Sequence, residues 1–285
     1  MSRILRYDKR AYSFGEGEMF KGKKIFFILC RAGVVWGLLS INLAYSWGSQ
    51  GHRVVGTIAE SHLAPETKKI IAEEFNINNL ADIAIWADKI RRNRKHENPW
   101  HYTNVKEGEW TYVISRDCPK RNYVIEKIKE FSSVLTNVEL PLKRRKVALK
   151  YLVHFVGDVH QPLYLGNLKD RGGGKIRLTY LGENVTLHYL WDGGLIDWKK
   201  VSLFKYAAHL NAQVQDLEKS KWLHFKVNDW ADESRSLALK YAYPLENNEL
   251  SKTYISKGRR ILNQRMVQAG IRLADLLNQL LKTEN

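Results

Sequence analysis

The chain has 285 residues, 44% of them hydrophobic, and a formal charge of +16. This length allows one large domain or two small ones, and the hydrophobic content excludes wholesale disorder. The positive charge favours a polyanionic partner, such as a nucleic acid, a phosphate ester or an anionic membrane surface.

The first 46 residues have the pattern of a signal peptide. KGKK at 21–24 precedes an apolar stretch, and Ala44-Tyr45-Ser46 places small residues at positions −3 and −1 of a cleavage site before Trp47. Arg31 interrupts the apolar stretch, which argues against a full membrane span. We therefore expect a protein that is secreted or periplasmic in a bacterium, with an uncleaved N-terminal anchor as the alternative.

The predicted cleavage site before Trp47 divides the chain into a removed segment at 1–46 and one domain at 47–285. Residues 1–18 resemble no part of a signal, so Met19 is a candidate for the true start. Residues 47–285 carry 38 Lys and Arg against 27 Asp and Glu, a formal charge of +11. They contain one cysteine, Cys118, which excludes an internal disulfide. We expect a monomer without a stable membrane span after cleavage, stabilised by its core and by metals.

Most apolar residues after position 47 recur at helical spacing. KIRLTYLGENVTLHY at 175–189 instead alternates around Gly182-Glu183, which predicts a β-hairpin. The expected fold is one mainly α domain with a small hairpin. The expected helices lie at 51–63, 65–75, 80–92, 121–135, 144–160 and 187–198, with long amphipathic helices in the C-terminal third, especially at 256–281.

Two histidine–aspartate pairs have the spacing of metal ligands. His154 and Asp158 are four residues apart, as are His188 and Asp192, and side chains at this spacing meet on one helix face. Imidazole and carboxylate without thiolate suit Zn²⁺, although Mn²⁺ or Fe²⁺ also fits. His52, Asp88 and His101 add donors of the same type. Cleavage before Trp47 would add its free amine and carbonyl oxygen as a chelating pair.

Several short motifs follow one another in a fixed order after position 47. They are WGSQGH at 47–52, WAD at 86–88, WHY at 100–102, HFVGDVHQPL at 154–163, DRGG at 170–173 and LHYLWDGGLI at 187–196. This ordered set resembles the S1/P1 nuclease family over nearly all of residues 47–285. Members are mostly helical, share the phospholipase C/P1 nuclease fold and hold three zinc ions, so the resemblance implies the same here.

The resemblance also implies three ligand sets. The second zinc would bind His188, Asp192 and a histidine ten residues after His154, a position that Tyr164 occupies here. Either the phenol binds zinc as a phenolate or the second site is weak or empty. The first zinc would bind Asp88, His101, His154 and Asp158, and the third would bind Trp47, His52 and the shared Asp158.

Other residues near the motifs are candidates for substrate contacts. By resemblance, Arg91 holds phosphate oxygens, although a solvated helix end explains it equally well. Asn104 stands where fungal and plant members have an acidic residue, so it orients substrate but is no strong base. Tyr102 stacks on a base or packs internally. His160 lies two residues from Asp158 and is expected to point away from the helix face that carries His154 and Asp158.

The combined expectation is a zinc-dependent endonuclease that hydrolyses single-stranded DNA or RNA, with 3′-nucleotidase activity as an addition. One alternative is a phosphodiesterase that acts on lipids as zinc phospholipase C does, since fold does not fix substrate. The other is a catalytically impaired, metal-stabilised protein that binds nucleic acid or a partner, if Tyr164 removes the second zinc.

Overall fold

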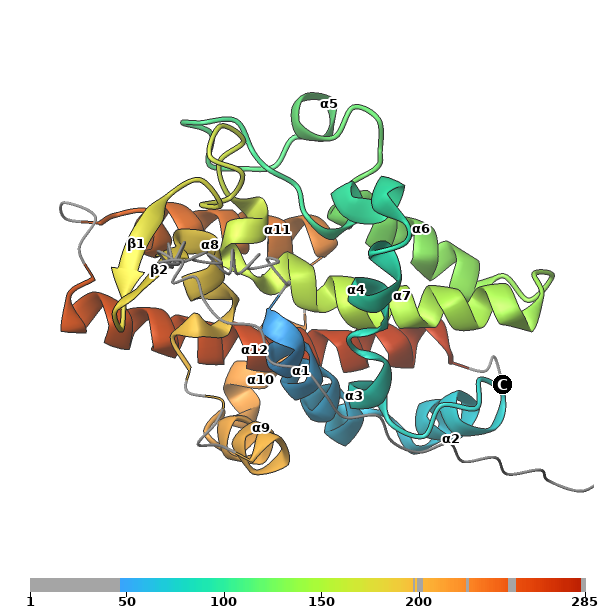
Figure 1. The fold of residues 1–285 in the computed structure, drawn as a ribbon. Helices are drawn as coiled ribbons and strands as arrows, with labels where there is room; N and C mark the ends of the chain where they lie inside the picture. Colours follow the sequence, from blue (N-terminus) through green and yellow to red (C-terminus); the bar gives the residue numbers. More distant parts are fainter. Residues whose placement is uncertain (1–46, 197, 199–201, 224–225, 246–249, 283–285) are drawn as a thin grey trace, which may run out of the picture. The chain divides into compact units, whose positions relative to one another are not determined.

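The computed structural model describes residues 47–282 except 197, 199–201, 224–225 and 246–249 (Figure 1). The expected signal peptide at 1–46 lies outside the described residues. Helices dominate, as the sequence predicts. The longer ones are α1 (Gly48–His62), α2 (Pro65–Glu73), α6 (Val124–Thr136), α7 (Leu142–His160), α9 (Leu203–Ala212), α11 (Val227–Leu237) and α12 (Lys252–Leu280). The shorter ones are α3 (Leu80–Ile83), α4 (Trp86–Arg91), α5 (Ile114–Asp117), α8 (Leu187–Tyr189), α10 (Asp216–Trp222) and the 3₁₀ or π turns η1 (Lys95–His101), η2 (Pro162–Leu165), η3 (Leu190–Gly194) and η5 (Ala238–Ala242).

Helix α7 forms the centre of the core. From Tyr151 to His160 each of its residues is buried, on all faces of the helix. A helix surrounded by protein in this way lacks a solvent face. It packs against α6 on one side and α12 on another (Figure 1). The histidines and the aspartate near its C-terminal end are therefore held in the interior.

Helix α12 secures the C-terminal end of α7. The Arg265 Nε atom donates to the His160 carbonyl oxygen at 3.0 Å, and Arg272 lies 3.0 Å from His160 Nε2. Both arginines pair with Glu233 of α11 at 2.6 Å. His160 Nδ1 bonds the Val156 carbonyl oxygen, so its ring faces α11 and α12. The expectation that His160 points away from Asp158 is confirmed.

A two-stranded sheet precedes α8. Strands β1 (Arg177–Tyr180) and β2 (Glu183–Thr186) pair antiparallel, with Arg177 opposite Thr186. Leu181 and Gly182 connect them, both with positive φ, as the two-residue turns of hairpins require. The hairpin predicted around Gly182 is confirmed, and it leads directly into the segment that carries His188.

The helix predicted at 80–92 is wrong as a single element. The chain instead forms α3 and α4, separated at Ala84 and Ile85. The Ala84 carbonyl oxygen accepts a hydrogen bond from His154 Nδ1 at 2.7 Å. This tertiary bond competes with the intrahelical bond that a continuous helix would make, which accounts for the break.

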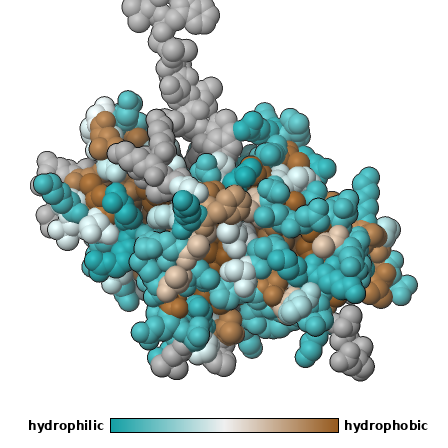
Figure 2. Space-filling model, turned by 90° about the horizontal axis from the view of Figure 1, so that it is seen from below, coloured by the Kyte–Doolittle hydropathy of each residue, from teal (hydrophilic) through white to brown (hydrophobic). Residues whose placement is uncertain are grey.

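Figure 2 shows one face of the molecule as mostly hydrophilic, with scattered hydrophobic groups. Among the described residues, no helix has both the length and the apolar character needed to cross a membrane.

Candidate metal centre and cleft

Four segments bring buried histidines and aspartates together. His52 comes from α1, Asp88 from α4, His101 from the end of η1, and both His154 and Asp158 from α7. All five side chains are at most 5% exposed. The sequence predicted each of them as a ligand, and the structure places them in one cluster.

The donor atoms in this cluster have the separations of ligands around shared cations. Asp158 Oδ2 lies 3.0 Å from His101 Nδ1 and 3.3 Å from His154 Nε2. Its Oδ1 atom lies 3.3 Å from His52 Nε2. Asp88 Oδ1 lies 3.6 Å from His154 Nε2. Tetrahedral ligands about 2.1 Å from a zinc ion are roughly 3.4 Å apart, so this donor set fits zinc.

The electrostatics of the cluster also favour a cation. Burial raises the pKa of Asp158 well above its ordinary value, and the neighbouring Asp88 charge adds to the rise. The Oδ1 atoms of both aspartates are buried without a hydrogen-bond partner among the described residues. Burial lowers the pKa of His101, so its imidazole is neutral and its nitrogen is available as a ligand. A buried carboxylate oxygen that lacks a hydrogen bond is costly, and a metal ion bound to that oxygen removes the cost.

Backbone carbonyls orient two of the histidines. His154 Nδ1 donates to Ala84, which leaves Nε2 directed at the two aspartates. His188 Nδ1 donates to the Gly172 carbonyl oxygen at 2.7 Å, which leaves its Nε2 atom 3.4 Å from Asp192 Oδ2. Such contacts select the ring tautomer and aim the free nitrogen at a metal.

Asp192 is held by a residue that the sequence did not single out. Gln161 Nε2 donates to Asp192 Oδ1 at 2.5 Å, and the Gln161 side-chain oxygen accepts the backbone N–H of Leu163. Its backbone oxygen accepts from Tyr164. Asp192 Oδ2 has no hydrogen-bond partner among the described residues. Burial raises the pKa of Asp192 to about 7, although His188 and Gln161 lower it.

Tyr164 lies beside this second pair. Its side chain is buried, and its ring centroid is 5.1 Å from that of His188. Burial raises the pKa of the phenol well above its ordinary value, and the charges of Asp192 and Asp158 add to the rise. A phenolate here therefore requires a cation. Whether Tyr164 binds zinc stays a prediction.

Trp47 is fixed against the helix that carries the cluster. It is fully buried, and its indole Nε1 donates to the Gly157 carbonyl oxygen at 2.6 Å. The His52 ring stacks on the His154 ring, with centroids 3.9 Å apart. The start of α1 thus lies next to the cluster, as the proposed ligand set of Trp47 and His52 requires. The ligand role of the Trp47 amine stays a prediction, since it depends on cleavage.

A cleft of about 880 Å³ opens beside the cluster. Of the predicted site residues, its lining includes Arg91, Tyr102, Asn104, Tyr164 and His188. The Arg91 guanidinium lies 3.2 Å from Asp88 and is mostly buried. Burial alone would lower the pKa of Arg91, but the surrounding negative charges, Asp88 first, outweigh it and raise the pKa, so Arg91 is a permanent cation in the lining of the cleft.

The cleft is basic and partly aromatic beyond the predicted residues. The Tyr102 and Tyr123 rings are roughly parallel, with centroids 6.2 Å apart. The position of Tyr123, like that of Gln161, follows from the tertiary fold, and no sequence spacing marks either residue. The other cations of the lining are Lys106, Arg116, Arg171 and Lys175.

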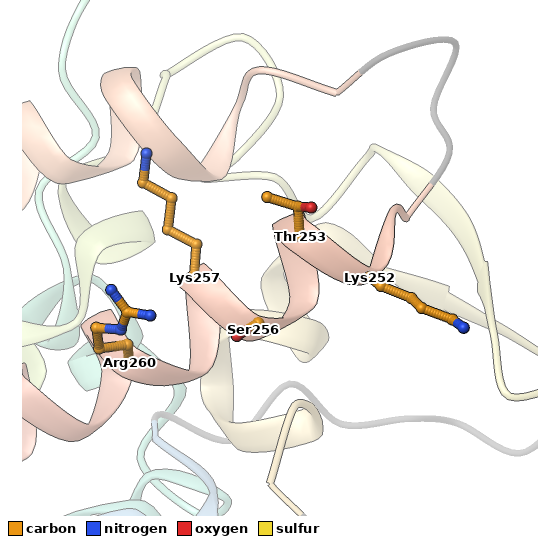
Figure 3. Close-up of a pocket in the computed structure, with 5 residues that line it drawn as sticks. All are labelled: Lys252, Thr253, Ser256, Lys257 and Arg260. Carbon is orange, nitrogen blue, oxygen red and sulfur yellow. The ribbon is translucent and has the colours of Figure 1, made fainter.

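Another hollow, of about 490 Å³, lies along the start of α12. It combines Lys252, Lys257 and Arg260 with two hydroxyl side chains (Figure 3). Lys252 and Lys257 extend in different directions, and Lys257 lies over the Tyr241 ring. This arrangement provides no converging set of reactive groups, so the centre beside α7 is the better candidate.

Comparisons with known proteins show the family of the chain. The family model for S1/P1 nuclease matches residues 47–282. Endonuclease 2 of Arabidopsis thaliana is 27% identical over 86% of this chain and 94% of its own length. Nuclease S1 of Aspergillus oryzae is 28% identical over 83% and 92%, and nuclease P1 of Penicillium citrinum is 26% identical over 82% and 97%. The chain belongs to the S1/P1 nuclease family.

Proposed function

We propose that this protein is an exported, monomeric, zinc-dependent endonuclease that hydrolyses phosphodiester bonds in single-stranded DNA or RNA and releases phosphate from 3′-nucleotides. The observation that carries the proposal is the basic, aromatic cleft that meets a buried cluster of histidines and aspartates. Relatives named as nucleases and the signal-like pattern at 1–46 support it.

Zinc would be held by the residues whose donor atoms converge. The first position would use Asp88, His101, His154 and Asp158, the second His188, Asp192 and Tyr164, and the third Trp47, His52 and the shared Asp158. When bound, zinc supplies Lewis-acid chemistry, which makes water more nucleophilic at neutral pH and offsets charge on a phosphoryl group.

The protein's own residues would bind and orient the substrate. Arg91, held in place by Asp88, would donate to two phosphoryl oxygens through its planar fork. The Asn104 amide, at the cleft wall, would orient the adjacent sugar or base without acting as a strong base. The cations at the cleft would attract the phosphate backbone.

Preference for single strands would follow from the aromatic side chains. Tyr102 and Tyr123 line the cleft, and a base stacks on such a ring only when it is free of its partner strand. The lining carries several cations, which suit the successive phosphates of a nucleic acid better than the single phosphate of a lipid headgroup, and this favours nucleic acid over the phospholipase alternative.

The test is a comparison of substrates with purified, zinc-loaded protein. We expect faster hydrolysis of a single-stranded oligonucleotide than of the same sequence as a duplex, and no hydrolysis of phosphatidylcholine. Hydrolysis of phosphatidylcholine alone would support the lipid phosphodiesterase instead. Binding without hydrolysis of any substrate would support the impaired binding protein.

A further inference from the structure

A further hollow, of about 420 Å³, reaches Asp88 of the candidate metal centre from outside the cleft, and we call it the second hollow. Its lining consists of Gly48 and Ser49 of α1, Ile85, Asp88 and Lys89 of α4, Arg92 just after α4, and Tyr189 of α8. Among the described residues, its lining and that of the cleft have no member in common. The two hollows are nevertheless adjacent, because Asp88 lines one and its ion-pair partner Arg91 lines the other.

Two short helices form the ridge between the hollows. Consecutive residues of a helix point about 100° apart, and residues three apart share a face. Lys89 of α4 and Arg92, the residue after its end, line the second hollow, whereas Arg91 lines the cleft. In α8, His188 lines the cleft and Tyr189 lines the second hollow. The candidate ligands Asp88 and His188 thus lie on the ridge.

The chemistry of the second hollow suits a nucleotide. Lys89 and Arg92 provide positive charge, and Tyr189 is 42% exposed, so much of its ring is open for contact. Helix α1 begins there without a capping side chain and without an acidic residue in its first turn. Its first N–H groups therefore add further donors for an anion. The volume lies within the range of ligand pockets.

We propose that the second hollow binds the nucleotide on the other side of the scissile phosphate from the nucleotide in the cleft. A single strand would then cross the ridge between Arg91 and Lys89, with its phosphate at the metal centre. This proposal rests on the proposed nuclease function and extends it. It predicts a preference for phosphates with nucleotides on both sides, since a nucleoside 3′-monophosphate occupies the cleft alone.

The test compares two substrates with the zinc-loaded double variant Lys89→Gln/Tyr189→Ala. The measured quantity is kcat/KM for a single-stranded trinucleotide divided by kcat/KM for a nucleoside 3′-monophosphate. We expect this ratio to fall about tenfold in the variant, because stacking and charge are lost on one side only. An unchanged ratio would overturn the proposal.

The matched control is Phe204→Ala/Lys205→Gln, which removes an exposed aromatic ring and an exposed lysine from α9, outside both hollows. Its ratio should equal that of the wild type. An equal fall in the control would show that the effect does not come from the hollow, and the proposal would be wrong.

Binding separates this proposal from the proposed function. A fluorescent octanucleotide with phosphorothioate linkages of one configuration, selected because the wild type leaves it intact, allows its dissociation constant to be measured without turnover. We expect about fivefold weaker binding by Lys89→Gln/Tyr189→Ala than by the control. If the wild type hydrolyses neither substrate, the proposed nuclease function fails. Equal dissociation constants for variant and control would then show that the second hollow binds no nucleotide, and this proposal would fail as well.

Discussion

At the scale of single residues, the candidate centre depends on side chains that position other side chains. Gln161 is the clearest case, because its amide joins Asp192 to the segment that carries Tyr164. Hydrogen bonds of this kind fix the orientation of a carboxylate that binds a metal. They also explain why Asp192 directs its Oδ2 atom towards His188.

Replacing Gln161 should therefore weaken one metal position. Gln161→Leu removes the donor to Asp192, and we expect about 10- to 100-fold weaker zinc binding at that position, measured by competition with a chelator. Gln268→Leu also removes a buried amide, one that bonds Arg265 away from the cluster, and should leave zinc affinity unchanged. Equal affinity in both variants would mean that Gln161 only supports the fold.

Asp192 should also make stability depend on pH once metal is removed. Its pKa is about 7 in the folded protein, against an ordinary value of 3.8. Between these values the folded protein keeps a proton that the unfolded chain releases, so this group's contribution falls as pH rises from about 4 to 7.

The measurement is the melting temperature of chelated protein from pH 4.5 to 7.5, for the wild type and Asp192→Asn. The buried histidines His101 and His154 have lowered pKa values, so their contribution rises with pH up to about 6.5. That contribution is common to both proteins. We expect the wild type to lose stability relative to the variant as pH rises, and parallel curves would contradict the assignment.

At the scale of elements, α7 determines how closely the ligands approach. Gly157 lies between His154 and Asp158, and a methyl group at this position would come within 2.8 Å of His52 Nδ1. Gly157→Ala should therefore displace His52, destabilise the fold by about 1–3 kcal/mol and lower the zinc content.

Gly270→Ala is the matched control for this prediction. Its added methyl group would overlap Ile58 at 2.6 Å, where α12 packs on α1. We expect a similar loss of stability in chemical denaturation, but the full zinc content in elemental analysis. If both variants keep their zinc, close contact at Gly157 has no role in the metal centre.

Sequence patterns predicted the elements better than the contacts between them. The spacing of His154 and Asp158 identified one pair of neighbours, and the alternation at 175–189 identified the hairpin. The break at Ala84 was not predictable, because it depends on a bond to His154, 70 residues away. Gln161 and Tyr189 lacked a signal for the same reason, since their roles come from packing between distant segments.

At the scale of the whole molecule, the candidate metal centre joins segments from α1 to η3. Burying its carboxylates without cations is unfavourable, so metal binding and folding should be coupled. Removal of zinc by a chelator should lower the melting temperature, and added zinc should restore it. An unchanged melting curve after verified removal would show that the fold is independent of the metal.

The central claim is that the buried histidines and aspartates form a metal centre together with Trp47 and Tyr164. The most direct test is native mass spectrometry of the chain that begins at Trp47. We predict three zinc ions per molecule, falling to two when an extra residue precedes Trp47 and blocks its amine. Two ions in the chain that begins at Trp47 would contradict the role of Tyr164, and an unchanged count after the extra residue is added would contradict the role of the Trp47 amine. A chain that retains no zinc after purification in its presence would contradict the whole claim.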